Sequence, residues 1–221
     1  MTTKGSYTDL TTLKDYCKIA GSNTDDDTAL TSLITAVSDW IDNYCQRTFG
    51  SEAGTVRTVN GTGSFRVAMP EDLQAVTLLE VALYEGATYS TVPGDGISYP
   101  SDFYLEPKDN LPGRPYRWID FGLLPTTSIG AFYRGHRTVR VTGTWGWSAV
   151  PASVANACLE ICKTINRARR TGDAGEVGEG QFGSQKIGRF VTSDVKAMLH
   201  EFQIVRVGSS APFPVGRVGW A

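Results

Sequence analysis

Carboxylate, thiol and imidazole side chains are the groups of this sequence that could do chemistry. The run Asp25–Asp27 offers three carboxylates, which are the ligands that a hard cation prefers. Adjacent residues of a helix point in different directions, whereas carboxylates at a helix start face its free amides and the positive end of its dipole. We therefore interpret the run as the start of a helix and not as a cation site.

The thiols and imidazoles are too few and too scattered to predict a metal site. Free cysteine tends to lie in protein cores, and we expect buried thiols at Cys17, Cys45, Cys158 and Cys162. Cys158 and Cys162 are one helical turn apart on the apolar face of a predicted helix. The only histidines, His136 and His200, have no zinc-ligand spacing with the cysteines.

Catalytic motifs are missing from the sequence. It contains no GxSxG and no HExxH pattern, and its glycine-rich segment lacks the phosphate-binding pattern GxxxxGK[ST]. Two acids far apart in the chain could still form a hydrolytic pair, with possible members at Glu80, Asp102, Glu106 and Asp120. Solvated acids at strand ends are our preferred interpretation of these four residues. We expect no catalytic residue, no metal and no cofactor.

The composition limits the class of protein further. The chain has 221 residues, 41% of them hydrophobic, which is enough for one domain with a core and extensions. Its formal charge of −2 argues against tight capture of nucleic acid. The start lacks the pattern of a signal peptide, and no segment reaches the roughly 18 apolar residues of a membrane span. We expect folding in a cytoplasm.

Three helices are predicted to position the other elements, over residues 11–20, 25–49 and 151–170. Each carries apolar residues at spacings of three and four, which mark one buried face. Gly21 is suited to end the first helix and Pro151 to open the third. A fourth helix is expected to start at Thr192 or Ser193.

Between the second and third helices, residues 55–147 change to a period of two with frequent turn residues, which predicts an antiparallel sheet or barrel. In the clearest strand, Arg137 to Trp147, Trp145 and Trp147 share a face with valines and are expected in the core. Other predicted strands are Phe65 to Met69 before Pro70, Ala75 to Tyr84, Phe103 to Leu105 and Trp118 to Phe121. The predicted fold class is therefore α+β, with a bundle of small N-terminal and central helices beside a β-rich region.

The last part of the chain divides into a loop and an arm. Residues 171–190 are rich in glycine and poor in apolar residues, which indicates a flexible loop. Residues 191–221 contain the fourth helix and an extended arm whose Pro- and Gly-rich end carries large apolar residues. Large apolar residues on an irregular segment need a partner. Residues 1–170 are then the main domain.

The order of these elements resembles the head-tail connector proteins of tailed bacteriophages, also called adaptor or head completion proteins. Three motifs carry the resemblance, which covers roughly residues 7 to 170. They are Leu13-Lys14-Asp15-Tyr16 with the acidic restart at Asp25–Asp27, the helix end from Ile41 to Phe49, and the strand Val141 to Trp147 that leads through Val150-Pro151 into a helix. The β-rich middle and the extension after Arg170 are longer than in the shorter members.

The resemblance implies a non-enzymatic structural protein of the virion neck, made in the cytoplasm of a bacterial host. It implies a homo-oligomeric ring, typically of twelve copies, with the portal above, a tail-side completion or stopper protein below and a channel through which DNA passes. We hypothesise that the arm docks on the portal through Gln203, Ile204, Val205, Phe213, Val215, Val218 and Trp220. Lys186 and Arg189 are hypothesised to face the channel or a neighbouring subunit.

Two other classes stay open at this point. One is a different virion component, such as a tail-completion or decoration protein. The other is a small β-rich carbohydrate-binding or hydrolase module. A binding module would leave Trp118, Trp145 and Trp147 on an open face, whereas a connector would bury the strand tryptophans and pack the helices together.

Overall fold

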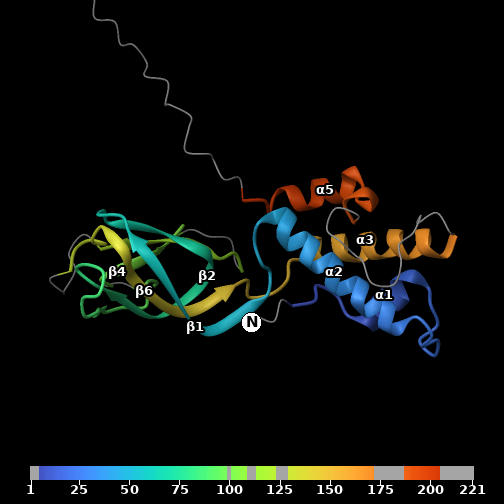
Figure 1. Ribbon diagram of the computed structural model, residues 1–221, viewed down its shortest axis with the longest axis horizontal. Coiled ribbons are helices and arrows are strands. Elements are labelled where there is room, and N and C mark those ends of the chain that lie inside the picture. The colour runs from blue at the N-terminus through green and yellow to red at the C-terminus, as the bar shows by residue number, and fades with distance from the viewer. Residues whose placement is uncertain (1–4, 99–100, 109–112, 123–128, 172–186, 205–221) are drawn as a thin grey trace, which may run out of the picture.

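The computed structural model describes residues 5–98, 101–108, 113–122, 129–171 and 187–204. The molecule is elongated, with helices at one end and strands at the other (Figure 1). The helical part contains α1 (Leu10–Cys17), α2 (Asp27–Cys45), α3 (Ala152–Thr171), the short 3-10 helix η1 (Gly188–Phe190) and α5 (Ser193–His200). The predicted α+β class, with a helical bundle beside an antiparallel sheet, is confirmed.

The helix ends follow local chemistry. The Asp9 side chain accepts a hydrogen bond from the Thr12 amide at 2.8 Å and caps α1. The helix ends at Cys17 and not at Ala20 as expected, because Lys18 adopts a left-handed conformation with φ of 56°. α2 spans Asp27–Cys45 and not residues 25–49 as expected, and its N-cap residue Asp26 makes no side-chain capping hydrogen bond. Asp27 forms an ion pair with the buried ammonium of Lys14, which we did not predict.

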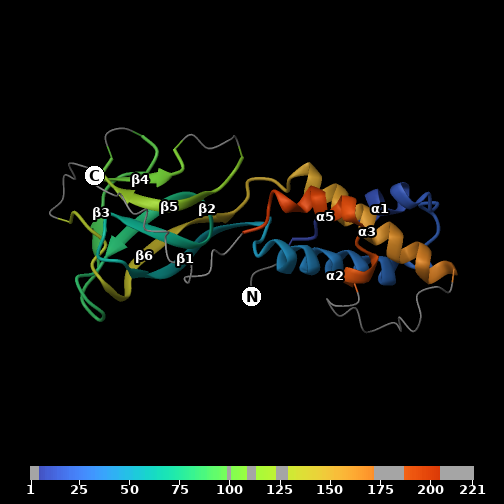
Figure 2. The ribbon, with the colours of Figure 1, turned by 90° about the horizontal axis from the view of Figure 1, so that it is seen from above.

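The helices pack around one apolar cluster. α2 and α3 supply most of it, and α1 and α5 cover its sides, as the views in Figures 1 and 2 agree. Three of the four cysteines, Cys45, Cys158 and Cys162, are buried in this cluster as free thiols, and Cys17 is half-buried. Burial of these thiols confirms their predicted role as small apolar core residues.

The strands form one antiparallel sheet in the order β1-β6-β2-β5-β4, with β3 paired to β2 (Figure 2). Their bounds are β1 Ser51–Gly61, β2 Arg66–Val81, β3 Ser90–Val92, β4 Phe103–Glu106, β5 Tyr116–Phe121 and β6 Gly135–Gly146. The neighbours β1 and β2 both pair with β6, which therefore lies inside the sheet. The strand predicted over Arg137 to Trp147 corresponds to β6.

Pro70 does not end a strand, which corrects the sequence-based expectation. β2 continues through it with an irregular register between Ala68 and Leu73, where the strand changes partner from β5 to β6. A bulge leaves residues without ladder hydrogen bonds and bends the strand, so a proline is tolerated there. The bulge brings Glu71 and Asp72 to the end of the sheet that faces the helices.

Burial also corrects part of the predicted strand pattern. Phe65 is 66% exposed and precedes β2, while Leu83 and Tyr84 lie beyond its end and are exposed. Trp145 and Trp147 are buried as predicted, but in two different clusters. Gly146, with φ of 87°, separates them and turns the chain from the sheet cluster to the helical cluster.

Candidate interaction site at the helix–sheet junction

The junction between helices and sheet contains two networks of ion pairs among the described residues. The chain crosses it from α2 to β1 and again from β6 to α3. At the crossing, the rings of Phe49, Trp147 and Phe202 pack together, with centroids 5.4 to 5.7 Å apart. These rings fix the end of α5 against both crossing segments.

Asp72 is the centre of the buried polar contacts. Its carboxylate, 4% exposed, accepts a hydrogen bond from Arg47 at 3.0 Å and one from the Trp147 indole at 2.9 Å. Arg117 of β5 lies 3.9 Å away. Burial raises the pKa of Asp72 despite these partners, and burial also lowers the pKa of Arg47. Burial of both charges makes each depend on the other.

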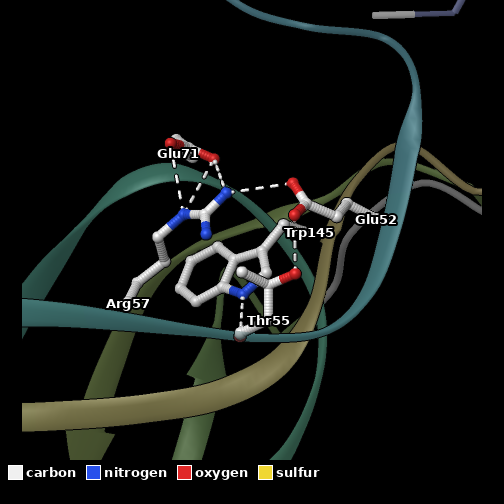
Figure 3. A network of polar contacts seen from close by, with 5 residues as sticks. All are labelled: Glu52, Thr55, Arg57, Glu71 and Trp145. Atoms are coloured by element: carbon white, nitrogen blue, oxygen red, sulfur yellow. Dashed lines mark hydrogen bonds and ion pairs between the residues drawn. The ribbon is translucent and has the colours of Figure 1, made fainter. Parts of the chain in front are cut away.

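A second network surrounds Arg57 of β1 (Figure 3). Its guanidinium binds Glu52 at 3.0 Å and Glu71 at 3.2 Å and lies 5.6 Å from the centre of the Trp145 ring. The Trp145 indole donates to the Thr55 carbonyl at 2.8 Å, and the Thr55 hydroxyl donates to Glu52 at 2.6 Å. The Arg57–Glu71 ion pair thus links β1 to the bulge of β2, and the hydrogen bond between Thr55 and Trp145 links β1 to β6.

The two networks line a cleft of about 320 Å³. Four carboxylates and two guanidinium groups contribute to its walls, so the cleft has an excess of negative charge. The lining residues are Asp42, Asn43, Gln46, Arg47, Thr48, Gly50, Ser51, Glu52, Arg57, Pro70, Glu71, Asp72, Trp145, Gly146 and Ile204. Arg47 forms an ion pair with Asp72, and Arg57 forms ion pairs with Glu52 and Glu71. Because these charges are already paired, the cleft favours a structural or interaction role over catalysis.

The first residues of the hypothesised docking arm lie at this cleft. The Ile204 amide donates to the Cys45 carbonyl at 3.1 Å, and the Gln203 side chain donates to the Tyr44 carbonyl at 3.3 Å. Gln203 and Ile204 therefore bind the end of α2 in their own chain. The other residues proposed for docking, Val205, Phe213, Val215, Val218 and Trp220, lie outside the described residues.

The two residues hypothesised to face a channel are not brought together by the described structure. Arg189 lies on η1 with an exposed side chain, next to the buried Ile187. Lys186 lies outside the described residues. Their common role remains a prediction.

The acids considered for a hydrolytic pair have structural partners. Asp120 binds Arg66 through two hydrogen bonds, and Glu80 lies 3.4 Å from Arg140. Glu106 accepts a hydrogen bond from the Lys108 amide, and Asp102 is buried. Two of the four are strand acids balanced by arginines, which agrees with the non-catalytic interpretation.

Within the described ranges, no group of three or more His, Cys, Asp or Glu residues is placed to hold a metal ion. The helices of those ranges include none that is both long and apolar enough to cross a membrane.

The two residues at the centre of the junction, Arg47 and Asp72, do not stand out in the sequence. Arg47 lies in the helix-end motif from Ile41 to Phe49, but its partner Asp72 stands in a segment with no recognised pattern. Continuing the alternation of Val67 and Met69 would place Glu71 and not Asp72 on the buried face, so periodicity gives no signal for Asp72.

Fold and junction together define the class: an α+β protein with a helical bundle joined to an antiparallel sheet through a polar cleft. Residues 7–103 match the family model described as Phage gp6-like head-tail connector protein. The predicted resemblance to phage head-tail connectors is thereby confirmed. The match runs from Tyr7 to the first residue of β4, so it covers α1, α2 and the first strands.

Solved structures share the fold over almost the whole chain. Chains of the neck of an empty gene transfer agent particle, determined with C6 symmetry, cover 96% of this chain and 97% of their own, with 18% identity and a TM-score of 0.55. The virion of the native gene transfer agent gives the same coverage and identity with a TM-score of 0.54. The neck of the native particle with C12 symmetry gives 92% of each chain, 18% identity and a TM-score of 0.51. No curated protein matches the chain significantly.

Proposed function

We propose that this chain is a head-tail connector that forms a ring under the portal of a phage or phage-like particle, joins the capsid to the tail and lines the DNA channel. The observation that carries the proposal is the family match over residues 7–103. The shared fold with neck chains of gene transfer agents supports the same location. The C12 symmetry of one of those necks favours a ring of twelve copies.

The charge of the chain is compatible with a conduit for DNA. A net charge of −2 gives little electrostatic affinity for phosphates, because each phosphate neutralised by Lys or Arg adds salt-sensitive binding. The chain as a whole then adds little electrostatic affinity that would slow the passage of DNA. Of the three tryptophans that a β-rich carbohydrate-binding module would expose, Trp145 and Trp147 are buried, which speaks against that alternative. Trp118 is 40% exposed, and the Arg66 guanidinium lies 5.9 Å from its ring centre.

The arm that follows Ile204 is proposed to dock on the portal, with Phe213 and Trp220 as its anchors, since buried aromatic residues often dominate interface energy. A chain that ends at Ile204 keeps every residue of the helical cluster and both hydrogen bonds to the end of α2. We expect this truncated protein to fold and to lose cosedimentation with portal rings. Cosedimentation equal to that of the full chain would contradict docking by the arm.

A second, smaller proposal concerns Lys186 and Arg189, which we place toward the channel or a neighbouring subunit. Replacing both with Ala is expected to reduce retention of packaged DNA, because two cations near the phosphates are lost. The measurement is the DNA content of purified particles, with Lys196→Ala on the exposed side of α5 as a control. Equal retention in all three preparations would exclude a channel role.

A further inference from the structure

The sheet has three outer strands, β1, β4 and the three-residue β3, and their free edges differ. β1 has 11 residues and pairs with β6, and within the described part of the chain no strand pairs with its other edge. At the opposite side of the sheet, β4 has four residues. An exposed edge is a template for pairing with another chain, and proteins usually shorten or cover it.

The edge of β4 is covered by the chain itself. The Leu105 amide donates to the Gly96 carbonyl at 2.8 Å, which uses a donor that pairing with β5 leaves free. Close packing supports this cover, because a Cβ at Gly96 would lie 2.7 Å from the side chains of Leu105 and Phe103. A neighbouring chain therefore cannot extend the sheet at Leu105 without displacing the segment around Gly96.

Protection of the β1 edge is limited to its ends, where the pairing with β6 is irregular between Glu52 and Thr55 and between Val59 and Gly61. The strand contains no proline, and its two charged residues, Glu52 and Arg57, are bound to each other and to neighbouring groups in the junction networks. Between its two register irregularities, the run Thr55–Val59 pairs regularly with β6. Within this run, Val56 is 48% exposed and Thr58 is exposed as well.

We propose that the open edge of β1 binds an extended segment of a neighbouring copy of this chain, which adds a strand to the sheet and closes the ring. The inference rests on the proposed connector function. Backbone groups of an edge strand select an extended chain, and the exposed uncharged side chains of Val56 and Thr58 favour a segment without strong charge.

In a ring, the partner of β1 is a second copy of the chain, and that copy contributes a surface different from its own β1. Ring closure requires a heterologous interface, in which two different surfaces of the same chain meet. Pairing of β1 with β1 would give a closed dimer, and the covered edge of β4 excludes a sheet continued from β1 to β4. The strand β3 has three residues and is too short to pair along the run Thr55–Val59. The added segment therefore comes from a loop or arm of the neighbour.

The test places a photoreactive benzophenone amino acid at Thr58 of the full chain, assembles the protein with cognate portal rings and irradiates the complex. Thr77, an exposed threonine of the inner strand β2, is the matched control position. We expect covalent dimers of this chain from the Thr58 position and at least tenfold fewer from Thr77. Adducts with the portal, equal yields at both positions or no adduct in an assembled complex would overturn the interface.

Failure of the proposed function gives a different result in the same experiment. A protein that does not join the portal at all overturns the connector proposal and the interface that rests on it.

In a second measurement, V56K combined with T58K should raise the concentration for half-maximal assembly at least tenfold, while T77K should leave it unchanged. Circular dichroism checks that all variants stay folded, as expected for exposed positions. Unchanged assembly of the double variant would also overturn the interface.

Discussion

At the scale of single residues, the buried pair Asp72 and Arg47 holds the junction together. Asp72→Ala removes the carboxylate that Arg47 and the Trp147 indole contact, and leaves a largely buried guanidinium without its closest partner. We expect a loss of about 3–5 kcal/mol in the free energy of unfolding, as is typical when one member of a buried pair is removed. Urea unfolding followed by tryptophan fluorescence measures the loss.

The neighbouring Glu71 provides the control for this prediction. Its side chain is 54% exposed and its partner Arg57 keeps Glu52. Glu71→Ala should therefore cost less than about 1 kcal/mol, as exposed ion pairs do. Equal effects of the two substitutions would show that Asp72 does not organise the junction.

The sequence predicted residues whose environment follows from local periodicity, and missed those defined by a distant partner. The apolar faces of the helices placed Cys45, Cys158 and Cys162 in the core correctly. Asp72 could not be recognised, because its partners stand 25 and 75 positions away in the chain. Val56 and Phe65 illustrate the same limit, since only the neighbours of a strand decide which of its faces is covered.

At the scale of elements, the end of β6 is the most constrained point of the backbone. Gly146 has φ of 87°, and a Cβ there would lie 1.7 Å from the Gly50 carbonyl oxygen. Gly146→Ala should destabilise the protein by about 2 kcal/mol or more, because a positive φ strains an L residue and the backbone of the α2–β1 crossing must move. Thermal unfolding compares it with Gly21→Ala, whose Cβ would meet nothing within 4 Å. Similar melting temperatures would contradict this role of Gly146.

Element types were predictable because period two and period 3.6 are properties of the local sequence. Strand bounds and pairing were not. β2 passes through Pro70 because a bulge places that residue outside the regular ladder, and the strand then changes partner. Such a bulge is defined by β5 and β6 together, which the sequence around Pro70 does not reveal. The left-handed Lys18 likewise ended α1 before the glycine that seemed suited to end it.

At the scale of the whole molecule, two apolar clusters meet at one polar junction, and the arm proposed to dock on the portal leaves the described chain there at Ile204. A force on the arm would therefore be transmitted to the end of α2, through the hydrogen bonds of Gln203 and Ile204, and to the segment that leads into β1. The order of motifs predicted the family, because the N-terminal helices and first strands carry its features. The arrangement of copies in a ring could not be read from one sequence, since a heterologous interface joins two surfaces that are far apart in it.

The measurement that tests the connector account most directly is the mass of the purified protein by light scattering, alone and after mixing with the cognate portal ring at moderate salt. The account predicts a complex whose mass exceeds that of the portal by an integral set of copies, with twelve as the expected number. A monomer that keeps its own mass in the presence of the portal would contradict the account and move the chain to another position in the particle.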